Sequence, residues 1–352
     1  MMQSASIFNK RLAAVIANVF AAGLLMVAPA YSANLSFALF GDVYMTPEHQ
    51  GYLKGMLADM ADKNEALAIF TGGLKPTDQG CQDKHLLAAF PIFAQAPLPT
   101  FYVPGDAEWA LCTKFTPEDR LALLRKTYYQ SNTSLGEPSL PLSRQPDYPE
   151  LMRWELDSGK AIFATLNVTG NNNRWGNKTD ASSEYLDRNA TSLTWLQDTF
   201  RIAADKAISM LVIVMHGDPE FNTPGETEAP KGYRPLIDQL RIATEQFKGQ
   251  VLLVHGGSGI HRIDHPLINP ANDLPYQNFT RVETYGALQQ GWVEVSIAKN
   301  KLGGDDPITR TEFRFESFPW PPLSDDIDPN MGQEIGTMDG RVDTNPAGSN
   351  KQ

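Results

Sequence analysis

The chain has 352 residues and a formal net charge of −11, with a sequence pI near 5.0. This length allows one large domain or two smaller ones, each with a well-buried core. Nucleic acids are bound through clustered Lys and Arg side chains, and this acidic sequence has no such cluster, so its composition argues against a nucleic-acid partner.

Residues 1–32 are predicted to be a signal peptide. Two basic residues precede the apolar run "LAAVIANVFAAGLLMVAPA", which ends in small residues. We expect cleavage near residues 30–33, after Ala30 or Ser32. An uncleaved membrane anchor is the alternative, because the run is almost long enough to span a bilayer, but Pro29 and the small residues favour cleavage. No second run of this length follows, so we expect a secreted or periplasmic protein without membrane contact after cleavage.

Short apolar runs alternate with amphipathic segments over much of the chain. The runs predict buried strands at 35–40, 67–70, 100–103, 161–168, 210–215 and 251–254. Apolar residues recur at helical spacing in 53–60 and 236–247, and 116–126 begins with Thr as N-cap and Pro at the first helical position. This alternation predicts an α/β fold whose central strands are largely parallel.

The pattern changes toward the end of the chain. Residues 279–285, 292–297 and 309–318 alternate polar and apolar side chains, which predicts half-exposed antiparallel strands that form a second sheet or extend the first. Residues 319–352 are rich in Pro, Asp, Gly and Asn and are predicted to be a disordered tail. The folded domain is therefore expected to span 33–318.

Two cysteines, Cys81 and Cys112, are present. An oxidising compartment favours pairing them, and such a bridge would stabilise the fold by roughly 3–4 kcal/mol. Two buried free thiols are the alternative. Metal ligation by the cysteines is less favoured, because the close spacing of zinc-binding cysteines is missing.

Acidic and imidazole side chains follow the predicted strands. In open α/β sheets, ligands collect outside the carboxyl ends of the strands, and here these positions hold Asp42, Asp106, His216 with Asp218, and His255. Carboxylates and imidazoles that converge can bind divalent cations, and two such cations can clamp a phosphoester. The alternative is that Asp and Gly stand at these ends only because turns favour them.

Six segments occur in a defined order: "FALFGD", "TGGLKP…GCQD", "YVPGDAEWALC", "TLNVTGNNNRW", "MHGDPEF" and "LLVHGGSGIHRIDHPL". This set resembles the calcineurin-like metallophosphoesterases, and within them an exported bacterial branch with the motifs GDNEW and HGDxH. The resemblance runs from about Leu35 to Phe318, and its matching cysteines support a disulfide between Cys81 and Cys112. It implies an α/β fold of two facing mixed β-sheets flanked by helices. It also implies a dinuclear centre of Mn, Fe or Zn, where a metal-bound hydroxide attacks a small phosphoester.

The resemblance assigns metal-ligand roles to Asp42, Asp106, His216 and His255, and His261 lies two residues beyond a lost ligand. Each has a plainer interpretation. The two carboxylates can simply accept backbone N–H bonds in their turns, and the histidines can be satisfied core or surface residues.

Other ligand positions are lost. Gly73 replaces the bridging Asp, Ala107 replaces the Asn of GDNEW, and Gly257 and Gly259 replace the Asp and His of HGDxH. Two cations about 3.5–4 Å apart repel each other, and Gly cannot supply the anionic bridge that offsets this repulsion. We therefore expect an eroded centre with at most a single-metal site and weak or no catalysis.

A polar loop with Asn172 and Arg174 is a candidate for substrate binding, although loops of this composition are common. Two other functions stay open. The first is a catalytically silent module that binds an unknown protein partner or serves structure. The second is a serine hydrolase, suggested by "HGGSG", but Ile260 stands where the nucleophile motif needs Gly, and few acid and His candidates follow Ser258.

Overall fold

The computed structural model describes residues 35–156, 160–177, 179–221, 229–302 and 308–320. The predicted signal peptide lies outside the described residues, and so does the predicted tail from residue 321 onward. None of the described helices is long and apolar enough to cross a membrane.

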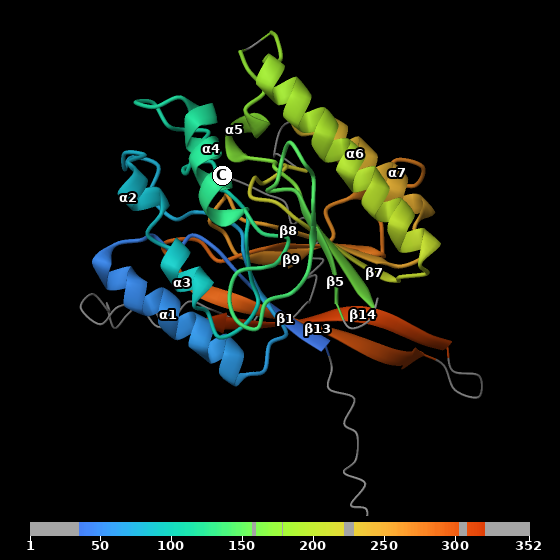
Figure 1. The fold of residues 1–352 in the computed structure, drawn as a ribbon. Helices are drawn as coiled ribbons and strands as arrows, with labels where there is room; N and C mark the ends of the chain where they lie inside the picture. The colour runs from blue at the N-terminus through green and yellow to red at the C-terminus, as the bar shows by residue number, and fades with distance from the viewer. Residues whose placement is uncertain (1–34, 157–159, 178, 222–228, 303–307, 321–352) are drawn as a thin grey trace, which may run out of the picture. The chain divides into compact units, whose positions relative to one another are not determined.

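The described strands form two large mixed sheets (Figure 1). The first contains, in spatial order, β14 (Ile308–Pro319), β13 (Gly291–Leu302), β1 (Leu35–Phe40), β2 (Ala68–Phe70) and β3 (Thr100–Tyr102). The second contains β4 (Ser143–Arg144), β5 (Met152–Leu156), β6 (Ala161–Thr165), β7 (Met210–Val214), β8 (Gln250–His255), β12 (Phe279–Glu283) and β9 (Arg262–Asp264). A small ribbon pairs β10 (Ile268–Asn269) with β11 (Leu274–Pro275).

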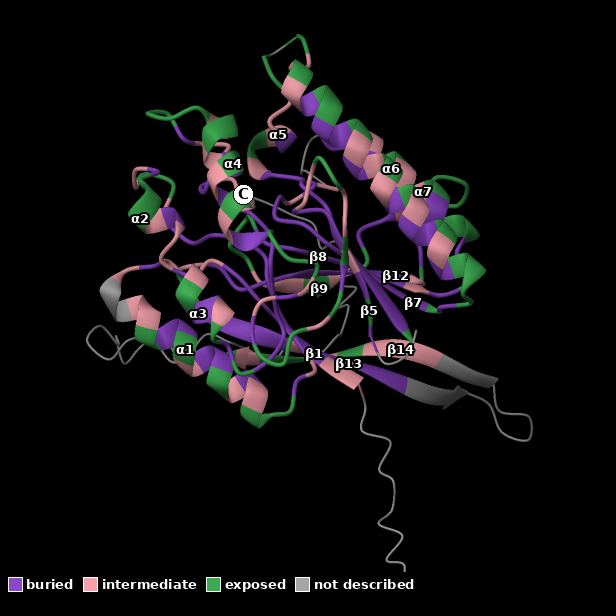
Figure 2. Cartoon of the chain, viewed as in Figure 1, coloured by how far each residue is buried: buried purple, intermediate pink, exposed green. Residues whose placement is uncertain are grey.

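The two large sheets pack face to face through aromatic side chains. Phe37 of β1 meets Phe163 of β6 with ring centroids 5.0 Å apart, and Phe101 of β3 stacks on Trp154 of β5 at 3.7 Å. One hydrophobic cluster contains buried residues from both sheets, and the strands that build it are largely buried (Figure 2). The predicted fold class, α/β with two facing mixed sheets, is confirmed.

Helices flank the sheets. They are α1 (Pro47–Asp62), α2 (Asp83–Leu86), α3 (Phe90–Ala94), α4 (Pro117–Tyr128), α5 (Gly170–Asn173), α6 (Ser183–Asp205) and α7 (Arg234–Gln246). The long helices α6 and α7 bury an apolar face on the second sheet, whereas α1 packs on the first, where Trp292 donates a hydrogen bond to Asp59 at 3.1 Å. The predicted start of α4 is confirmed: Thr116 caps the helix and Pro117 is its first residue.

One strand differs from its prediction. The sequence predicts a half-exposed antiparallel strand at 279–285, but β12 is buried along its whole length, and it pairs antiparallel with β9 on one side and in parallel with β8 on the other. Its polar side chains are not exposed; Arg281 forms ion pairs with Asp264 and Asp218 inside the protein. The prediction for the last two strands is confirmed, because β13 and β14 extend the first sheet as an antiparallel pair.

Cys81 and Cys112 form a disulfide with their Cα atoms 5.9 Å apart. The bridge connects the segment before α2 with the loop that follows β3. It therefore anchors both ends of the segment that carries Asp106.

Candidate active site at the strand ends

The first two strand ends meet at Asp42 and Gly73. Asp42 directly follows β1 and has a φ of 51°, and Gly73 lies in the turn after β2 with a φ of 88°. A Cβ atom at position 73 would overlap the Asp42 carboxylate. The Asp42 side chain thus fills the space into which a side chain at position 73 would project. Burial raises the pKa of Asp42 to about 7, and the neighbouring acids Glu108 and Asp106 act in the same direction.

Asp106 and His216 lie side by side after β3 and β7. His216 Nε2 is 3.3 Å from Asp106 Oδ1, and His216 Nδ1 is 2.7 Å from the carbonyl oxygen of Thr71. Because a carbonyl oxygen only accepts, Nδ1 carries a hydrogen and Nε2 is directed at Asp106. Burial alone would lower the pKa of His216, but the hydrogen bond and charge of Asp106 outweigh burial and raise it to about 10. His216 is therefore the cation of this cluster.

Glu108 contacts the same cluster through the turn after β2. Its side chain is fully buried, and its Oε1 accepts hydrogen bonds from the backbone N–H groups of Gly73 at 2.7 Å and Leu74 at 2.6 Å. Burial raises its pKa. Glu108 therefore holds the turn after β2 against the segment after β3, and its second oxygen has no hydrogen-bond partner.

A second cluster surrounds His255 at the end of β8. Its Nδ1 lies 2.7 Å from the carbonyl oxygen of Gly256, while its Nε2 has no hydrogen-bond partner and lies 3.9 Å from Asp218 Oδ1. Burial lowers the pKa of His255, so the ring stays neutral.

Two arginines supply the positive charge beside His255. Arg262 pairs with Asp218 and lies 2.8 Å from Glu283 Oε2, and Arg281 lies 3.6 Å from Asp218 Oδ1. Sequence reasoning missed Arg281 and Glu283, because their strand was expected to be exposed. The sequence of this strand could have indicated them. Phe279 and Val282 suggest burial, and charged residues on a buried strand need partners.

His261 is held elsewhere. Its Nδ1 lies 2.8 Å from the carbonyl oxygen of Glu283, its Nε2 lies 2.9 Å from Ser317 Oγ, and its ring stacks on Tyr285. The structure thus ties this side chain to β12 and β14 and does not bring it to Asp42 and Asp106. Since both ring nitrogens have these partners, His261 is not positioned as a base for Ser258.

Asn172 and Arg174 line a cavity of about 300 Å³. Both already have protein partners: Asn172 Oδ1 accepts a hydrogen bond from the N–H of Gly232 at 2.7 Å, and Arg174 Nη1 lies 2.8 Å from Glu118 Oε1. The predicted substrate-binding residues are therefore close together and engaged in holding their own loop.

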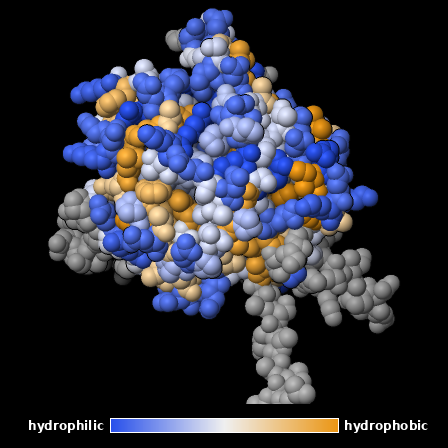
Figure 3. All heavy atoms as spheres, viewed as in Figure 1, coloured by the Kyte–Doolittle hydropathy of each residue, from blue (hydrophilic) through white to orange (hydrophobic). Residues whose placement is uncertain are grey.

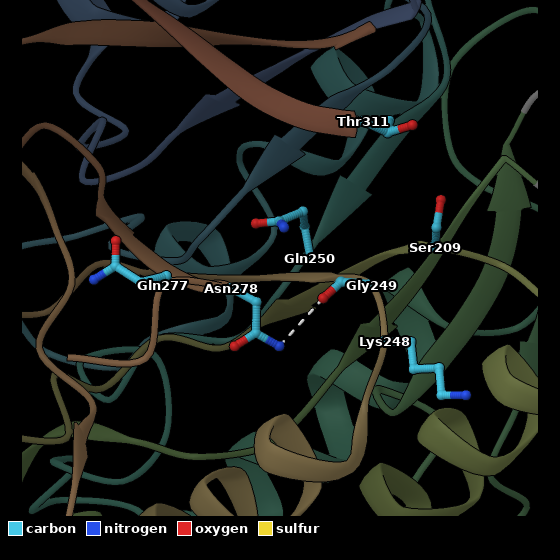
Figure 4. A pocket seen from close by; sticks show the side chains of 7 residues that line it. All are labelled: Ser209, Lys248, Gly249, Gln250, Gln277, Asn278 and Thr311. Carbon is cyan, nitrogen blue, oxygen red and sulfur yellow. Dashed lines mark hydrogen bonds between the residues drawn. The ribbon is translucent and has the colours of Figure 1, made fainter. Parts of the chain in front are cut away.

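A different cavity, of about 420 Å³, lies at the amino ends of β7, β8 and β12 (Figure 4). Ser209, Gln250, Gln277, Asn278 and Thr311 line it, and Asn278 donates a hydrogen bond to the Gly249 carbonyl at 3.3 Å. This lining contains amides, hydroxyls and one Lys but no Asp, Glu or His. The groups that acid–base or metal chemistry needs are at the other end of these strands.

The donors at the strand ends do not fit a two-metal centre. In the described part of the chain, no group of three or more His, Cys, Asp or Glu side chains is arranged to hold a metal ion. The space beside Gly73 is filled by the Asp42 carboxylate, and the cluster at His255 contains two guanidinium groups that would repel a cation. His216 supplies the positive charge beside Asp106, and Arg262 and Arg281 supply it beside His255.

The chain was compared with known proteins. No family model matches it, and no curated protein matches it. Solved structures that it resembles include a dimetal phosphatase from Danio rerio, with 9% identity, 82% of this chain and 100% of that chain covered, and a TM-score of 0.48. Another is PhoD, with 13% identity, 80% and 68% covered, and a TM-score of 0.49. A third is the purple acid phosphatase PPD1 from yellow lupin (Lupinus luteus) seeds, with 10% identity, 75% and 49% covered, and a TM-score of 0.46. At identities this low and TM-scores below 0.5, the chemistry of these proteins does not transfer to this chain.

Another buried carboxylate lies away from the strand ends, beneath the end of α1. Glu65 is only 5% exposed, and its side-chain neighbours are Ser36 and Glu294, with no cation of the described residues at ion-pair distance. Burial, together with the charge of Glu294 on β13, raises the pKa of Glu65 to about 8, and Lys63 opposes this only weakly. The raised pKa favours the protonated form of Glu65, whereas Asp106 and Asp218 at the strand ends pair with cationic side chains.

Proposed function

We propose that this chain is an exported relative of the calcineurin-like metallophosphoesterases that has become a binding or structural module. In this proposal, ion pairs hold the strand-end centre together where two metal ions would otherwise do so, and hydrolysis of small phosphoesters is weak or absent. The observation that carries the proposal is the pairing of Arg262 and Arg281 with Asp218 beside His255. The Asp42 carboxylate also supports the proposal, because it fills the space that a side chain at position 73 would need.

Metal content of the purified full chain tests this proposal. After incubation with Mn, Fe or Zn and removal of unbound ions, elemental analysis is expected to find only a small fraction of one ion per chain. Turnover of p-nitrophenyl phosphate should not exceed that of the Asp106→Ala variant prepared in parallel. One tightly bound ion per chain, with turnover that Asp106→Ala abolishes, would overturn the proposal.

Restoring the lost ligands gives the reverse experiment. The combined changes Gly73→Asp, Ala107→Asn, Gly257→Asp and Gly259→His are expected to create metal binding that the unmodified chain lacks. They should also lower stability, because the glycines at 73, 257 and 259 have φ values of 88°, 91° and 77°, which side chains adopt only with strain. Equal metal binding and equal turnover before and after restoration would contradict the proposal.

A single-metal phosphoesterase is the second candidate, and one observation favours it. The Thr71 carbonyl fixes Nδ1 of His216 as a donor and leaves Nε2 directed at Asp106, which is the orientation that metal-binding histidines usually have. In this candidate Asp42, Asp106 and His216 would hold one Mn, Fe or Zn ion. The same elemental analysis decides between the two, because only this candidate predicts one ion per chain that His216→Ala removes.

A further inference from the structure

The strand β14 forms one edge of the first sheet. It pairs over its full length with β13, and no other described strand pairs with its second side. None of residues 311–320 is fully buried. An edge of this length presents backbone N–H and C=O groups that can pair with another strand. Elsewhere on the face shown in Figure 3, apolar residues reach the surface in separate patches among hydrophilic ones.

Charged side chains alternate in sign along one face of β14. Glu312, Arg314 and Glu316 are separated by two residues each and therefore project to the same face. Arg314 has a side chain 56% exposed and lies 3.3 Å from Glu312 Oε1. On β13, Ala298 lies opposite Glu312, Ser296 opposite Arg314 and Glu294 opposite Glu316.

This alternation is complementary to itself when the direction of the strand is reversed. Two antiparallel copies of β14 related by a two-fold axis at Phe313 place Glu312 of each copy opposite Arg314 of the other. Phe313 then lies opposite Phe313, and an aromatic cross-strand pair of this kind is favourable. A slip of two residues in either direction pairs Glu312 with Glu312 or Arg314 with Arg314, and a parallel pairing in register pairs every charge with its like. A slip of four residues, centred on Phe315, pairs Arg314 with Glu316 but overlaps only 311–319, against 308–318 for the register centred on Phe313. Charge and overlap together therefore favour the antiparallel register centred on Phe313.

The geometry points to a homodimer in which β14 pairs with β14 of a second copy of this chain. Such pairing joins the two first sheets into one continuous sheet, and its two-fold symmetry closes the assembly at two copies. The partner is a second copy because the pattern of Glu312, Phe313 and Arg314 matches its own reverse. A partner strand of uniform charge would meet repulsion at one of the two charged positions.

Charge reversal tests the dimer. The full chain is expected to be a dimer by light scattering coupled to size-exclusion chromatography. Glu312→Arg and Arg314→Glu each place like charges opposite one another, so each should weaken dimerisation by about tenfold or more. The double variant, Glu312→Arg with Arg314→Glu, restores opposite charges in the same register and should dimerise like the unmodified chain.

Mixing the two single variants gives the most discriminating test of the dimer. A copy with Glu312→Arg and a copy with Arg314→Glu are complementary to each other, so an equimolar mixture of the two weakened variants should form a heterodimer. Arg201→Glu, a reversal at a side chain 62% exposed on α6, is the matched control and should leave the dimer unchanged. Circular dichroism shows that each variant is folded. A monomeric unmodified chain, or single variants that dimerise normally, or a mixture that stays monomeric, would overturn the proposal.

Discussion

Two buried carboxylates of this molecule, Asp106 at the strand ends and Glu65 near the end of α1, differ in charge state, although Asp42 and Glu108 beside Asp106 have raised pKa values as Glu65 does. At the strand ends, Asp106 faces the cationic His216, and burial, which favours its neutral form, is outweighed so that its pKa is lowered. Beneath α1, burial and Glu294 raise the pKa of Glu65 to about 8. Asp106 is thus an anion, whereas Glu65 favours its protonated form.

The difference lies in which partners the fold supplies. Ion pairs formed by His216, Arg262 and Arg281 are built from segments that follow or belong to different strands, so they connect those segments. Glu65 has no such cation at hydrogen-bond distance and must bind a proton instead. We infer that the fixed cations at the strand ends hold loops together, and that removing them costs more than removing the acid under α1.

The largest expected effect comes from Arg281→Met. The arginine side chain is 6% exposed and pairs with Asp264 and Asp218, so its loss removes the ion pair of the partly exposed Asp264 and leaves Asp218 with Arg262 alone. We expect a loss of about 3 kcal/mol in the free energy of unfolding, measured by chemical denaturation. Arg201→Met on the surface of α6 is the control and should change stability very little. A loss as small as the control's would contradict the role given to the arginines.

Glu108 comes next. Replacing it by Ala removes two hydrogen bonds to backbone N–H groups, those of Gly73 and Leu74, and we expect a loss of about 2–3 kcal/mol. Glu108→Gln keeps an acceptor oxygen and should lose clearly less. If the Gln and Ala variants were equally stable, the carboxylate would not be acting as an acceptor for this turn.

A smaller effect is expected from Gly73→Ala. The added Cβ atom meets the Asp42 carboxylate, and the φ of 88° at this position is strained for Ala, so we expect a loss of about 1–3 kcal/mol. Combining the change with Asp42→Gly removes the contact with the carboxylate, whereas the contact with the Cα of residue 42 at 2.7 Å and the backbone strain remain. A double-mutant cycle measures this coupling, and its absence would show that Asp42 does not fill the space at position 73.

The effect of Glu65→Gln depends on pH. The ordinary pKa of Glu65 is near 4.5 and its folded-state pKa is about 8, so the folded protein binds the proton more tightly. Stability from this group is complete below about pH 4.5 and is lost as the pH rises through 8. The Gln variant should lack this slope, so its stability advantage over the unmodified chain should grow between pH 4.5 and pH 8 and stay constant above it. Parallel stability–pH curves would refute the assignment.

Sequence patterns predicted the strands that are apolar throughout, such as 210–215, because burial of both faces requires uninterrupted apolar side chains. They did not predict that β12 is buried, because its charged residues look like solvent-facing ones until their partners from β9 and the loop after β7 are known. The longest described helix, α6, was also missed. Its buried face includes polar residues such as Arg188 and Asn189, which hide the helical period.

The candidate site was predictable in part for a similar reason. Asp42, Asp106 and His216 follow strands whose carboxyl ends meet at one edge, and the structure brings them together. His261 follows a strand as well, but hydrogen bonds to Glu283 and Ser317 turn its ring away. Ser317 lies 56 residues along the chain from His261, and no local pattern reports a contact at that separation.

The disulfide has one more consequence. Cys81 and Cys112 enclose β3, α2, α3 and the segment with Asp106 and Glu108 in a covalent ring. A protease that cuts the backbone once inside this ring opens it but frees neither part, so the nicked molecule should migrate as a single species on a non-reducing gel. After reduction, the same molecule should separate into two pieces.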